Sequence, residues 1–242
     1  MALVTGSSRG LGAGIALALA EAGASVAIHG SSQTPDATQK QLTEMGANTL
    51  ALVGDVGDAA VCEQLVEDTV KHFGRIDILV NNAGTIRRSA AIDHSEEDWQ
   101  TVIDVNLSSV FRLSKQAGKH MLPQGSGKII NIASLLTFQG GIRVPSYAAA
   151  KGGVGQLTKA FANEWASKGV NVNAIAPGYF ATDNTEALQN DPVRSRQILE
   201  RIPAGRWGEP EDLGGTIVFL ASSASNYVHG HVLVVDGGWL NR

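Results

Sequence analysis

The sequence predicts an α/β protein with one doubly wound sheet of parallel strands and helices on both faces. Seven short apolar runs, rich in β-branched residues, recur along the 242 residues. Several of these runs lack the alternation of a strand with one wet face, which is typical of strands covered on both sides. Segments with helical character lie between most of the runs, and this order favours parallel strands joined by right-handed crossovers.

The expected elements follow one another along the whole chain. The apolar runs occupy residues 2–5, 25–29, 49–53, 76–80, 128–133, 170–176 and 231–235. Among the segments between them, helices are expected at 10–23, 58–74, 95–121 and 147–168. The sequence contains no low-complexity linker, charged run or repeat of fixed period, so residues 1–242 are expected to form a single domain.

One long insertion precedes the last apolar run. Residues 178–208 contain Pro192 and Pro203 and are expected to be irregular. In an α/β fold, an insertion at this place is more typical of a lid over a binding site than of a linker.

The composition limits the classes of function that this chain can have. The chain is 43% hydrophobic and 17% charged, with a formal net charge of −4, so it offers no general attraction to nucleic acid or anionic membranes. Cys62 is the single cysteine, which excludes an internal disulfide and fits a reducing compartment. The start "MALVTG" resembles neither a signal peptide nor a membrane span. We expect a cytoplasmic protein with a small-molecule ligand, and we predict no metal site.

A glycine-rich stretch follows the first strand. "TGSSRGLG" places Gly6, Gly10 and Gly12 at the strand-to-helix turn, where glycine lets the backbone approach a ligand. The free N–H groups at the start of the next helix favour an anion, and nucleotides usually bind at the first strand of a doubly wound sheet. The alternative is a glycine-rich turn that binds nothing.

Two further segments follow strands at the same predicted edge. Asp55 comes after the third strand, and "NNAG" at 81–84 comes after the fourth. Ligands of open α/β sheets sit at the carboxyl ends of the strands, and Asp55 can accept a hydrogen bond from an adenine amino group. Taken singly, either segment can also be a helix cap or a turn.

The residues after the second strand bear on which dinucleotide binds. An NAD-selective site usually carries an acid here for the ribose 2′-hydroxyl, but "AIHGSSQTPD" has none before Asp36. Arg9 in the glycine loop can reach a 2′-phosphate, and His29 is a possible additional donor. The residues therefore permit NADP, unless Arg9 is a solvated surface charge.

Tyr147 and Lys151 stand four residues apart in "SYAAAK", on one face of a predicted helix. A tyrosine has a pKa of about 10, and a nearby ammonium lowers it by favouring the phenolate, which makes the pair a usable general acid and base. The alternative is a lysine that extends over a half-buried tyrosine.

Two polar residues accompany this pair. Ser134 ends the apolar run "KIINIAS" and is a good hydrogen-bond donor to a carbonyl or hydroxyl. Asn106 falls inside a helical run, where asparagine is unfavourable, so either its side chain has a specific role or it faces solvent.

Together these motifs, with "PGYFAT" at 177–182, resemble the short-chain dehydrogenase/reductase family along essentially the whole chain. The resemblance implies a Rossmann-type sheet of about seven parallel strands, an NAD(H) or NADP(H) cofactor and a homotetramer. It implies that Tyr147 exchanges the proton, that Ser134 orients the substrate oxygen, and that Lys151 holds the nicotinamide ribose and depresses the tyrosine pKa. It further implies that Asn106 maintains a water-linked proton path.

The predicted cofactor-binding set combines this resemblance with the loop positions. In the family, Asp55 and Val56 contact the adenine, while Pro177, Gly178 and Thr182 pack around the nicotinamide. The full predicted set is Gly6, Ser8, Arg9, Gly10, Leu11, Gly12, His29, Ser31, Asp55, Val56, Asn82, Ala83, Gly84, Tyr147, Lys151, Pro177, Gly178, Phe180 and Thr182.

Several longer stretches resemble family members that act on six-carbon sugar acids in uronate and pectin breakdown. They include residues 81–99, 129–147 and 171–188. The resemblance implies hydride transfer between the nicotinamide and a secondary alcohol or ketone of such an acid. Those members are generally NAD-linked, whereas this chain lacks the acid after its second strand and carries Arg9, so both cofactors stay open. Residue 1 already lies at the first strand, so the short leading segment common in the family is absent or not included.

A sugar acid needs cations for its carboxylate, and arginine can grip one with two hydrogen bonds. The predicted substrate residues are Arg143 and Arg88, with Ser134 and Tyr147, while Arg87 follows the same turn as Arg88. The arginines can instead be surface charges or interface salt bridges, and Arg206 is assigned to structure. Two alternatives share the fold: a 3-oxoacyl carrier-protein reductase, and a non-catalytic dinucleotide sensor.

Overall fold

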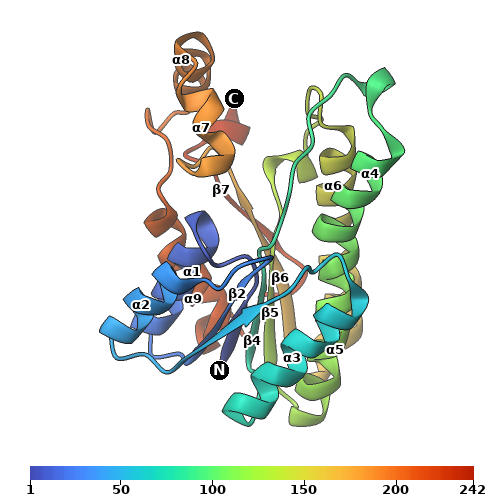
Figure 1. Cartoon of the computed structure of the whole chain (residues 1–242), viewed down its shortest axis with the longest axis vertical. Helices are drawn as coiled ribbons and strands as arrows, with labels where there is room; N and C mark the ends of the chain where they lie inside the picture. Colours follow the sequence, from blue (N-terminus) through green and yellow to red (C-terminus); the bar gives the residue numbers. More distant parts are fainter.

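All seven strands lie in one parallel sheet. Figure 1 shows the chain as a computed structural model, which describes residues 1–242 apart from the side chain of Asn184. The strand order is β3-β2-β1-β4-β5-β6-β7. The bounds are β1 Ala2–Val4, β2 Val26–Gly30, β3 Thr49–Val53, β4 Ile78–Asn81, β5 Gly127–Ile132, β6 Val170–Pro177 and β7 Val232–Val235. The predicted doubly wound parallel sheet is confirmed, and the strand order reverses between β1 and β4, where ligands of such sheets bind.

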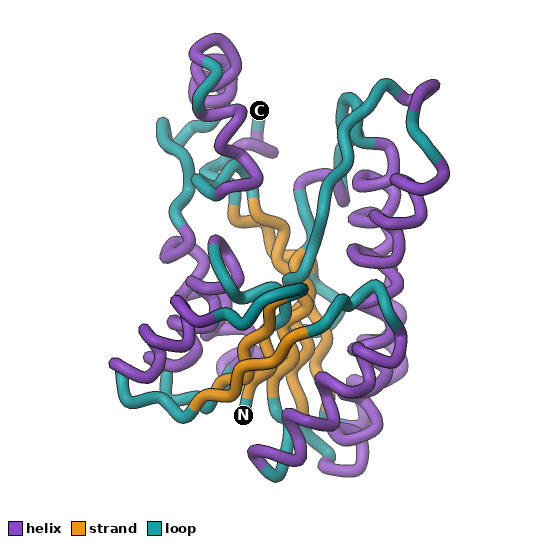
Figure 2. Tube along the Cα trace, viewed as in Figure 1, coloured by secondary structure: helices purple, strands orange, loops and turns teal.

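Helices cover both faces of the sheet (Figures 1 and 2). The bounds are α1 Gly10–Glu21, α2 Asp36–Glu44, α3 Ala59–Phe73, α4 Glu96–Ile103, α5 Ser109–Gln124, α6 Pro145–Trp165, α7 Glu186–Gln189, α8 Pro192–Arg201 and α9 Gly214–Ala221. One core joins the sheet to α1, α2 and α9, and the other joins it to α3, α5 and α6. None of the helices among the described residues has the length and apolar character needed to cross a membrane.

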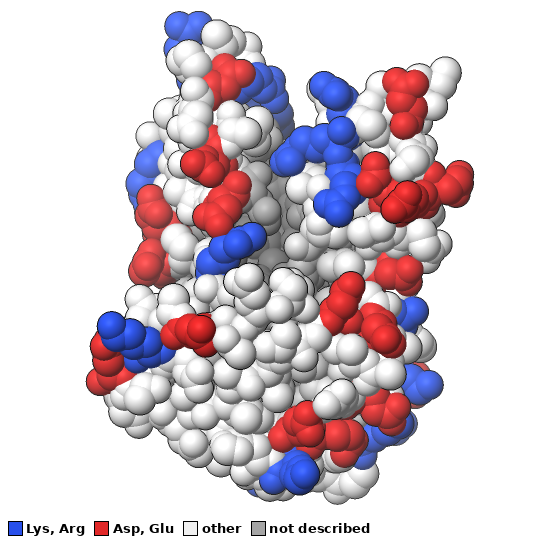
Figure 3. Space-filling model, in the orientation of Figure 1, with Lys and Arg blue, Asp and Glu red and all other residues white. Residues whose placement is uncertain are grey.

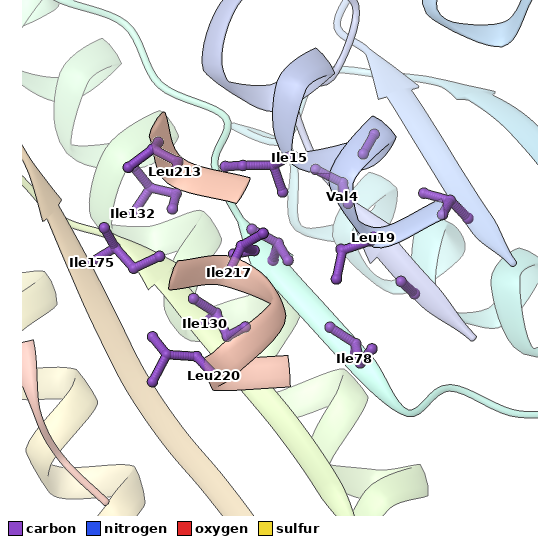
Figure 4. Close-up of a cluster of buried hydrophobic side chains, with 14 of the residues drawn as sticks. Val4, Ile15, Leu19, Ile78, Ile130, Ile132, Ile175, Leu213, Ile217 and Leu220 are labelled. Carbon is purple, nitrogen blue, oxygen red and sulfur yellow. The ribbon is translucent and has the colours of Figure 1, made fainter. Parts of the chain in front are cut away.

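Alternation along the strands divides the core into two layers. In β1, Ala2 and Val4 face the α1 and α9 layer, while Leu3 faces the α3 and α5 layer. Residues two apart share a face of a strand, so runs of consecutive apolar residues supply both layers at once. Figure 4 shows the first layer, where Ile217 and Leu220 of α9 lie among strand side chains.

The insertion at 178–208 differs from the irregular segment that was expected. It contains α7 and α8, and α8 begins at Pro192 behind Asp191, whose carboxylate accepts from the N–H groups of Val193 and Arg194 at 2.9 and 3.0 Å. Proline suits the first turn of a helix because that N–H has no partner there. Pro192 therefore starts a helix. The base of the insertion is closed by the Ala181 N–H, which donates to the Gly208 carbonyl at 2.7 Å.

The helix expected at 95–121 is interrupted. α4 runs into a π-helical turn at Asp104–Ser108 before α5 begins. Turns of this kind occur mostly as single insertions in α-helices and are frequent at functional sites. Asn106 lies within this turn and is fully buried.

Candidate active site

The glycine stretch forms a cradle between β1 and α1. Gly6 and Gly10 have φ angles of +63° and +56°, a region that favours glycine. A Cβ on Gly12 would overlap the Gly6 carbonyl oxygen and the side-chain amide of Asn82. The backbone at the start of α1 therefore stays bare, with its free N–H groups available to an anion. This shape fits the dinucleotide phosphates that the sequence predicts here.

The cradle is tied to the loop after β4. Asn82 donates from its side-chain amide to the carbonyls of Thr5 and Gly6, both at 2.9 Å. The Thr5 hydroxyl accepts from the backbone N–H groups of Asn82 and Ala83, both at 3.1 Å. Asn82 thus shapes the cradle from behind. Thr5, the first residue of the glycine stretch, shares this role, which its position in the sequence did not indicate.

His29 does not serve as a free donor to the cofactor, contrary to the expectation. Its Nδ1 accepts the Gly6 N–H at 3.0 Å, so Nε2 carries the hydrogen that is donated to the Gly54 carbonyl at 2.8 Å. The side chain is almost fully buried, and burial lowers its pKa, although the Gly54 hydrogen bond and the Asp55 charge partly oppose this. His29 is therefore a neutral link from β2 to the loops that follow β1 and β3.

Arg9 has a partner in the lid segment. Its Nε lies 2.9 Å from a carboxylate oxygen of Asp183, and both side chains are exposed. Ser31 and Asp55 are also exposed, at the ends of β2 and β3. One oxygen of Asp55 accepts the Gly57 N–H at 2.8 Å, which leaves its other oxygen for a ligand. The predicted adenine side of the site is thus open to solvent.

The remaining predicted cofactor residues border the carboxyl edge of the sheet. Pro177 ends β6, and the Gly178 N–H donates to the Val235 carbonyl at 2.9 Å. A Cβ on Gly10 would lie 3.6 Å from the Thr182 side chain, so the glycine loop and the lid segment meet. Phe180 differs from the rest because its ring belongs to the apolar core, so only its backbone can face a cofactor. Four other predicted residues lie along the same edge: Ser8 and Leu11 of the glycine loop, Val56 after β3, and Gly84 of the "NNAG" loop.

Tyr147 and Ser134 meet at this edge. The Ser134 side chain hydrogen-bonds the Tyr147 side chain, and it also accepts the Leu136 N–H at 3.2 Å. Burial raises the pKa of Tyr147, while the Ser134 hydrogen bond and the charge of Arg88 act in the opposite direction. A tyrosine held protonated beside a serine hydroxyl is arranged to donate a proton to a carbonyl oxygen between them.

Lys151 lies on the next turn of α6, with its Nζ 5.6 Å from the centre of the Tyr147 ring. Nζ donates to the Ile132 carbonyl at 2.5 Å, and burial lowers the lysine pKa to about 8. The expectation that the lysine depresses the tyrosine pKa needs correction, because burial raises that pKa and the opposing effects come from Ser134 and Arg88. The two side chains share a face as predicted, but burial dominates the pKa of each.

Asn106 joins the π-helical turn to the "NNAG" loop. Its Nδ2 donates to the carbonyls of Thr85 and Val102 at 2.8 and 2.9 Å, and its Oδ1 accepts the Thr85 N–H at 3.2 Å. A Cβ on Gly84 would lie only 2.8 Å from Asn106 Oδ1, which explains a glycine there. The solvent-facing alternative is wrong, and the side chain has the specific role that its unfavourable helix propensity indicated.

The predicted substrate arginines lie on two neighbouring loops. The charge of Arg88 acts on the Tyr147 pKa, so Arg88 lies close to the proposed proton donor. Arg143 is exposed and has a φ of 63°, the only positive value among the non-glycine residues that the structure describes. Arg87 instead pairs with Asp98 at 3.2 Å. Figure 3 shows lysine and arginine side chains on both walls of the hollow in the upper half of the molecule.

Comparison with known proteins places this geometry in a family. The family model described as enoyl-(acyl carrier protein) reductase, one of the short-chain dehydrogenase models, matches residues 6–240. The chain belongs to the short-chain dehydrogenase/reductase family. It is therefore an oxidoreductase, and this dehydrogenase/reductase family uses NAD(H) or NADP(H).

Several characterised relatives cover the full length of this short-chain dehydrogenase/reductase. The 2-dehydro-3-deoxy-D-gluconate 5-dehydrogenase of Escherichia coli is 55% identical, covering 100% of this chain and 96% of the relative. The enzyme of that name from Bacillus subtilis is 53% identical, with 100% and 94% covered. The crystal structure of a gluconate 5-dehydrogenase from Burkholderia cenocepacia in complex with NADP and tartrate is 40% identical, with a TM-score of 0.94 and 100% and 95% covered.

Sequence reasoning missed two groups at the site of this short-chain dehydrogenase/reductase. One is Asp183, the partner of Arg9, whose only signal was its place beside Thr182. The other is a hydrogen-bonded chain through Ser89, His94 and Ser146. No spacing in the sequence indicates that this chain of contacts forms.

Proposed function

We propose that this dehydrogenase transfers hydride between a nicotinamide cofactor and a ketone or secondary alcohol of a six-carbon sugar acid, as a 2-deoxy-D-gluconate 3-dehydrogenase does. The observation that carries the proposal is the pair of arginine-bearing loops beside the proton donor: the Ser89 N–H, next to Arg88, donates to the Arg143 carbonyl at 3.1 Å, and burial raises the Tyr147 pKa while the charge of Arg88 lowers it. Arg143 stands on the adjoining loop. Relatives at 53–55% identity carry the name 2-dehydro-3-deoxy-D-gluconate 5-dehydrogenase, which supports a substrate of this class.

The catalytic residues are assigned as follows. When bound, the reduced nicotinamide supplies hydride to the carbonyl carbon. Tyr147 donates its hydroxyl proton to the carbonyl oxygen, and Ser134 holds that oxygen by a hydrogen bond. Lys151, partly neutral at pKa about 8, holds the nicotinamide ribose and stabilises the tyrosinate when charged. Asn106 keeps the backbone of the "NNAG" loop in place beside a path for proton resupply through water.

The cofactor is held by the glycine cradle, the predicted residues after β3 and β4, and the segment from Pro177 to Thr182. NADP is compatible with the exposed Arg9 if its guanidinium exchanges Asp183 for a 2′-phosphate, and NAD is compatible with an unchanged ion pair. Specificity constants for NADH and NADPH decide between them. Replacement Arg9→Ala should lower the NADPH value about tenfold and leave the NADH value unchanged if Arg9 binds the phosphate.

A panel of carbonyl substrates tests the reaction. We expect the purified protein to oxidise NADH or NADPH with keto sugar acids, followed as loss of nicotinamide absorbance. Arg143→Ala and Arg88→Ala should raise the KM for the sugar acid, while Arg87→Ala, whose partner is Asp98, serves as the matched control. Preference for a 3-oxoacyl thioester over every sugar acid would favour the carrier-protein reductase alternative, and no turnover of any carbonyl would contradict an enzyme.

The lid is assigned to residues 178–208 of a single domain. Ile198 and Ile202 of this segment pack with Leu135 and Trp239, so the lid helices rest on the residue next to Ser134. The backbone pair between Ala181 and Gly208 keeps the two ends of the segment together. Closure of such a segment over bound substrate excludes water from the hydride-transfer step.

A homotetramer is proposed from the apolar face of α5 and α6. Phe111 is 44% exposed there and stacks on Phe161 at 6.1 Å, beside a groove lined by Leu107 and Leu157. A second copy of the chain would cover this face. Light scattering should give a tetramer, and Phe111→Glu should reduce the assembly.

We further propose a cytoplasmic enzyme of uronate and pectin breakdown.

A further inference from the structure

His94 bridges two segments of the site. It lies between the 3-10 turn Ala91–Asp93 and helix α4. Its Nδ1 is 2.7 Å from the Ser89 hydroxyl, and its Nε2 is 2.9 Å from the Ser146 hydroxyl. The two ring nitrogens point away from each other, so a single imidazole spans the gap between the two hydroxyls. Because a hydroxyl can donate or accept, both contacts are hydrogen bonds in either neutral tautomer.

The segment that His94 helps to fix is a loop that Asn106 also holds at Thr85 and Asp98 holds at Arg87. Residues 82–90 have no helix or strand and form the long loop that rises from β4 toward α4 in Figure 2. Arg87 and Arg88 on this loop are exposed. A loop of this kind is mobile unless tertiary contacts hold it. The position of Arg88 relative to the active site therefore depends on the contacts that anchor the loop.

A second contact joins the same loop to the other arginine. The Ser89 N–H donates to the Arg143 carbonyl at 3.1 Å. Arg143 has the left-handed backbone conformation, which an arginine adopts only when its surroundings hold it there. Ser89 is thus joined to His94 by its side chain and to Arg143 by its backbone. The two arginine-bearing loops form one unit around it.

The other end of the bridge reaches the catalytic helix. Ser146 is fully buried in the first turn of α6 and directly precedes Tyr147. Any movement of His94 away from Ser146 releases the loop from the helix that carries the proton donor. The hydrogen bonds from Ser89 through His94 to Ser146 therefore set the placement of the cations relative to the Tyr147 hydroxyl.

We propose that His94 is a positioning residue for the substrate carboxylate. It holds Arg88 and Arg143 beside Tyr147 without touching the substrate. The inference rests on the proposed function, since it requires an anionic substrate. It predicts that loss of His94 weakens binding of the sugar acid and leaves cofactor binding unchanged, because Asn82, at the far end of the 82–90 loop, keeps its own hydrogen bonds to Thr5 and Gly6 of the glycine cradle.

The test compares His94→Ala with His72→Ala, a surface histidine near the end of α3. In His94→Ala we expect a rise of roughly tenfold in the KM for a keto sugar acid, the order of one lost net hydrogen bond. The KM for a neutral ketone and the Kd of the reduced cofactor should change less than twofold. His94→Gln, which keeps a donor and an acceptor, should recover part of the sugar-acid KM. His72→Ala should match the wild type.

A cycle with Ser89→Ala checks that both residues act through the same bridge. The double variant should raise the sugar-acid KM no more than His94→Ala alone, and the Ser89→Ala variant keeps the test available if His94→Ala does not fold. The proposal would be overturned if the KM increases of the two single variants multiplied in the double variant. An unchanged sugar-acid KM in His94→Ala, or an equal rise in its neutral-ketone KM, would overturn it as well. If the wild-type enzyme reduces no sugar acid at all, the proposed function fails first, which distinguishes the two failures.

Discussion

Replacement of Lys151 by methionine should stabilise the protein without cofactor. Lys151 is 4% exposed, and burial lowers its pKa from 10.5 to about 8. A group with a depressed folded-state pKa binds fewer protons in the folded state than in the unfolded state at intermediate pH. Below pH 8 the folded protein must hold a buried charge. Methionine has similar length and no charge, so the substitution removes this penalty.

The magnitude follows from two opposing contributions. A fall in pKa from 10.5 to about 8 corresponds to roughly 3 kcal/mol of destabilisation at neutral pH, at about 1.4 kcal/mol for each pKa unit. Methionine leaves the Ile132 carbonyl without its donor, which costs about 1–3 kcal/mol. The expected net gain is therefore on the order of 1 kcal/mol. For a chain of this size that raises the Tm by about 2–4 °C.

The pH dependence isolates the charge from the hydrogen bond. Above the unfolded pKa of 10.5, Lys151 is neutral in both states and its burial does not lower the free energy of unfolding. That free energy falls as the pH drops below 10.5, and the full penalty is present once the pH has passed the folded value of about 8. The Tm advantage of Lys151→Met should accordingly be largest near pH 7 and shrink between pH 8 and 10. Differential scanning calorimetry across this range measures it. A variant that is less stable than the wild type by the same amount at every pH would refute the reasoning.

Three further predictions concern the cofactor edge and the core. Gly12→Ala should raise the cofactor Kd at least about tenfold in a fluorescence titration, because its Cβ overlaps the Gly6 carbonyl; wild-type affinity would contradict the cradle. His29 has a lowered pKa, so its stabilising effect is present above pH 6.5 and lost in acid; His29→Asn should flatten the Tm profile there, and an unchanged profile would be the contrary result. Burial raises the pKa of Cys62 to about 11, so thiol reagents should label it only after unfolding, and rapid labelling of the folded enzyme would contradict this.

The strands were readable because each one is a short, continuous apolar run. The second strand was expected at 25–29 and is found at Val26–Gly30. Helix α8 carried a readable signal as well, in Asp191 followed by Pro192, but the whole of 178–208 was expected to be irregular. The π-helical turn had a weaker sign, since Asn106 marked an unfavourable position without showing how the helix accommodates it.

Contacts within the site were less accessible to sequence reasoning. Tyr147 and Lys151 share a helix face as their spacing requires, yet their pKa values are governed by burial, which depends on how β5, α6 and the lid close together. His29 was assigned to the cofactor because of its place at a strand end. Its actual role follows from the distances to Gly6 and Gly54, which only the packed loops define.

Cofactor binding should reverse the order of stability between the wild type and Lys151→Met. Without cofactor, the hydrogen bond to the Ile132 carbonyl does not offset the burial of the Lys151 ammonium, so the carboxyl edge of the sheet destabilises the fold while the two apolar layers stabilise it. A ribose hydroxyl beside Lys151 would supply the missing hydrogen bonds, and a ligand that binds only the folded state stabilises it in proportion to its affinity. With saturating reduced cofactor, the wild type should gain more in Tm than Lys151→Met and exceed it. Equal gains in both proteins would show that Lys151 makes no contact with the cofactor, whatever its effect on the stability of the unliganded chain.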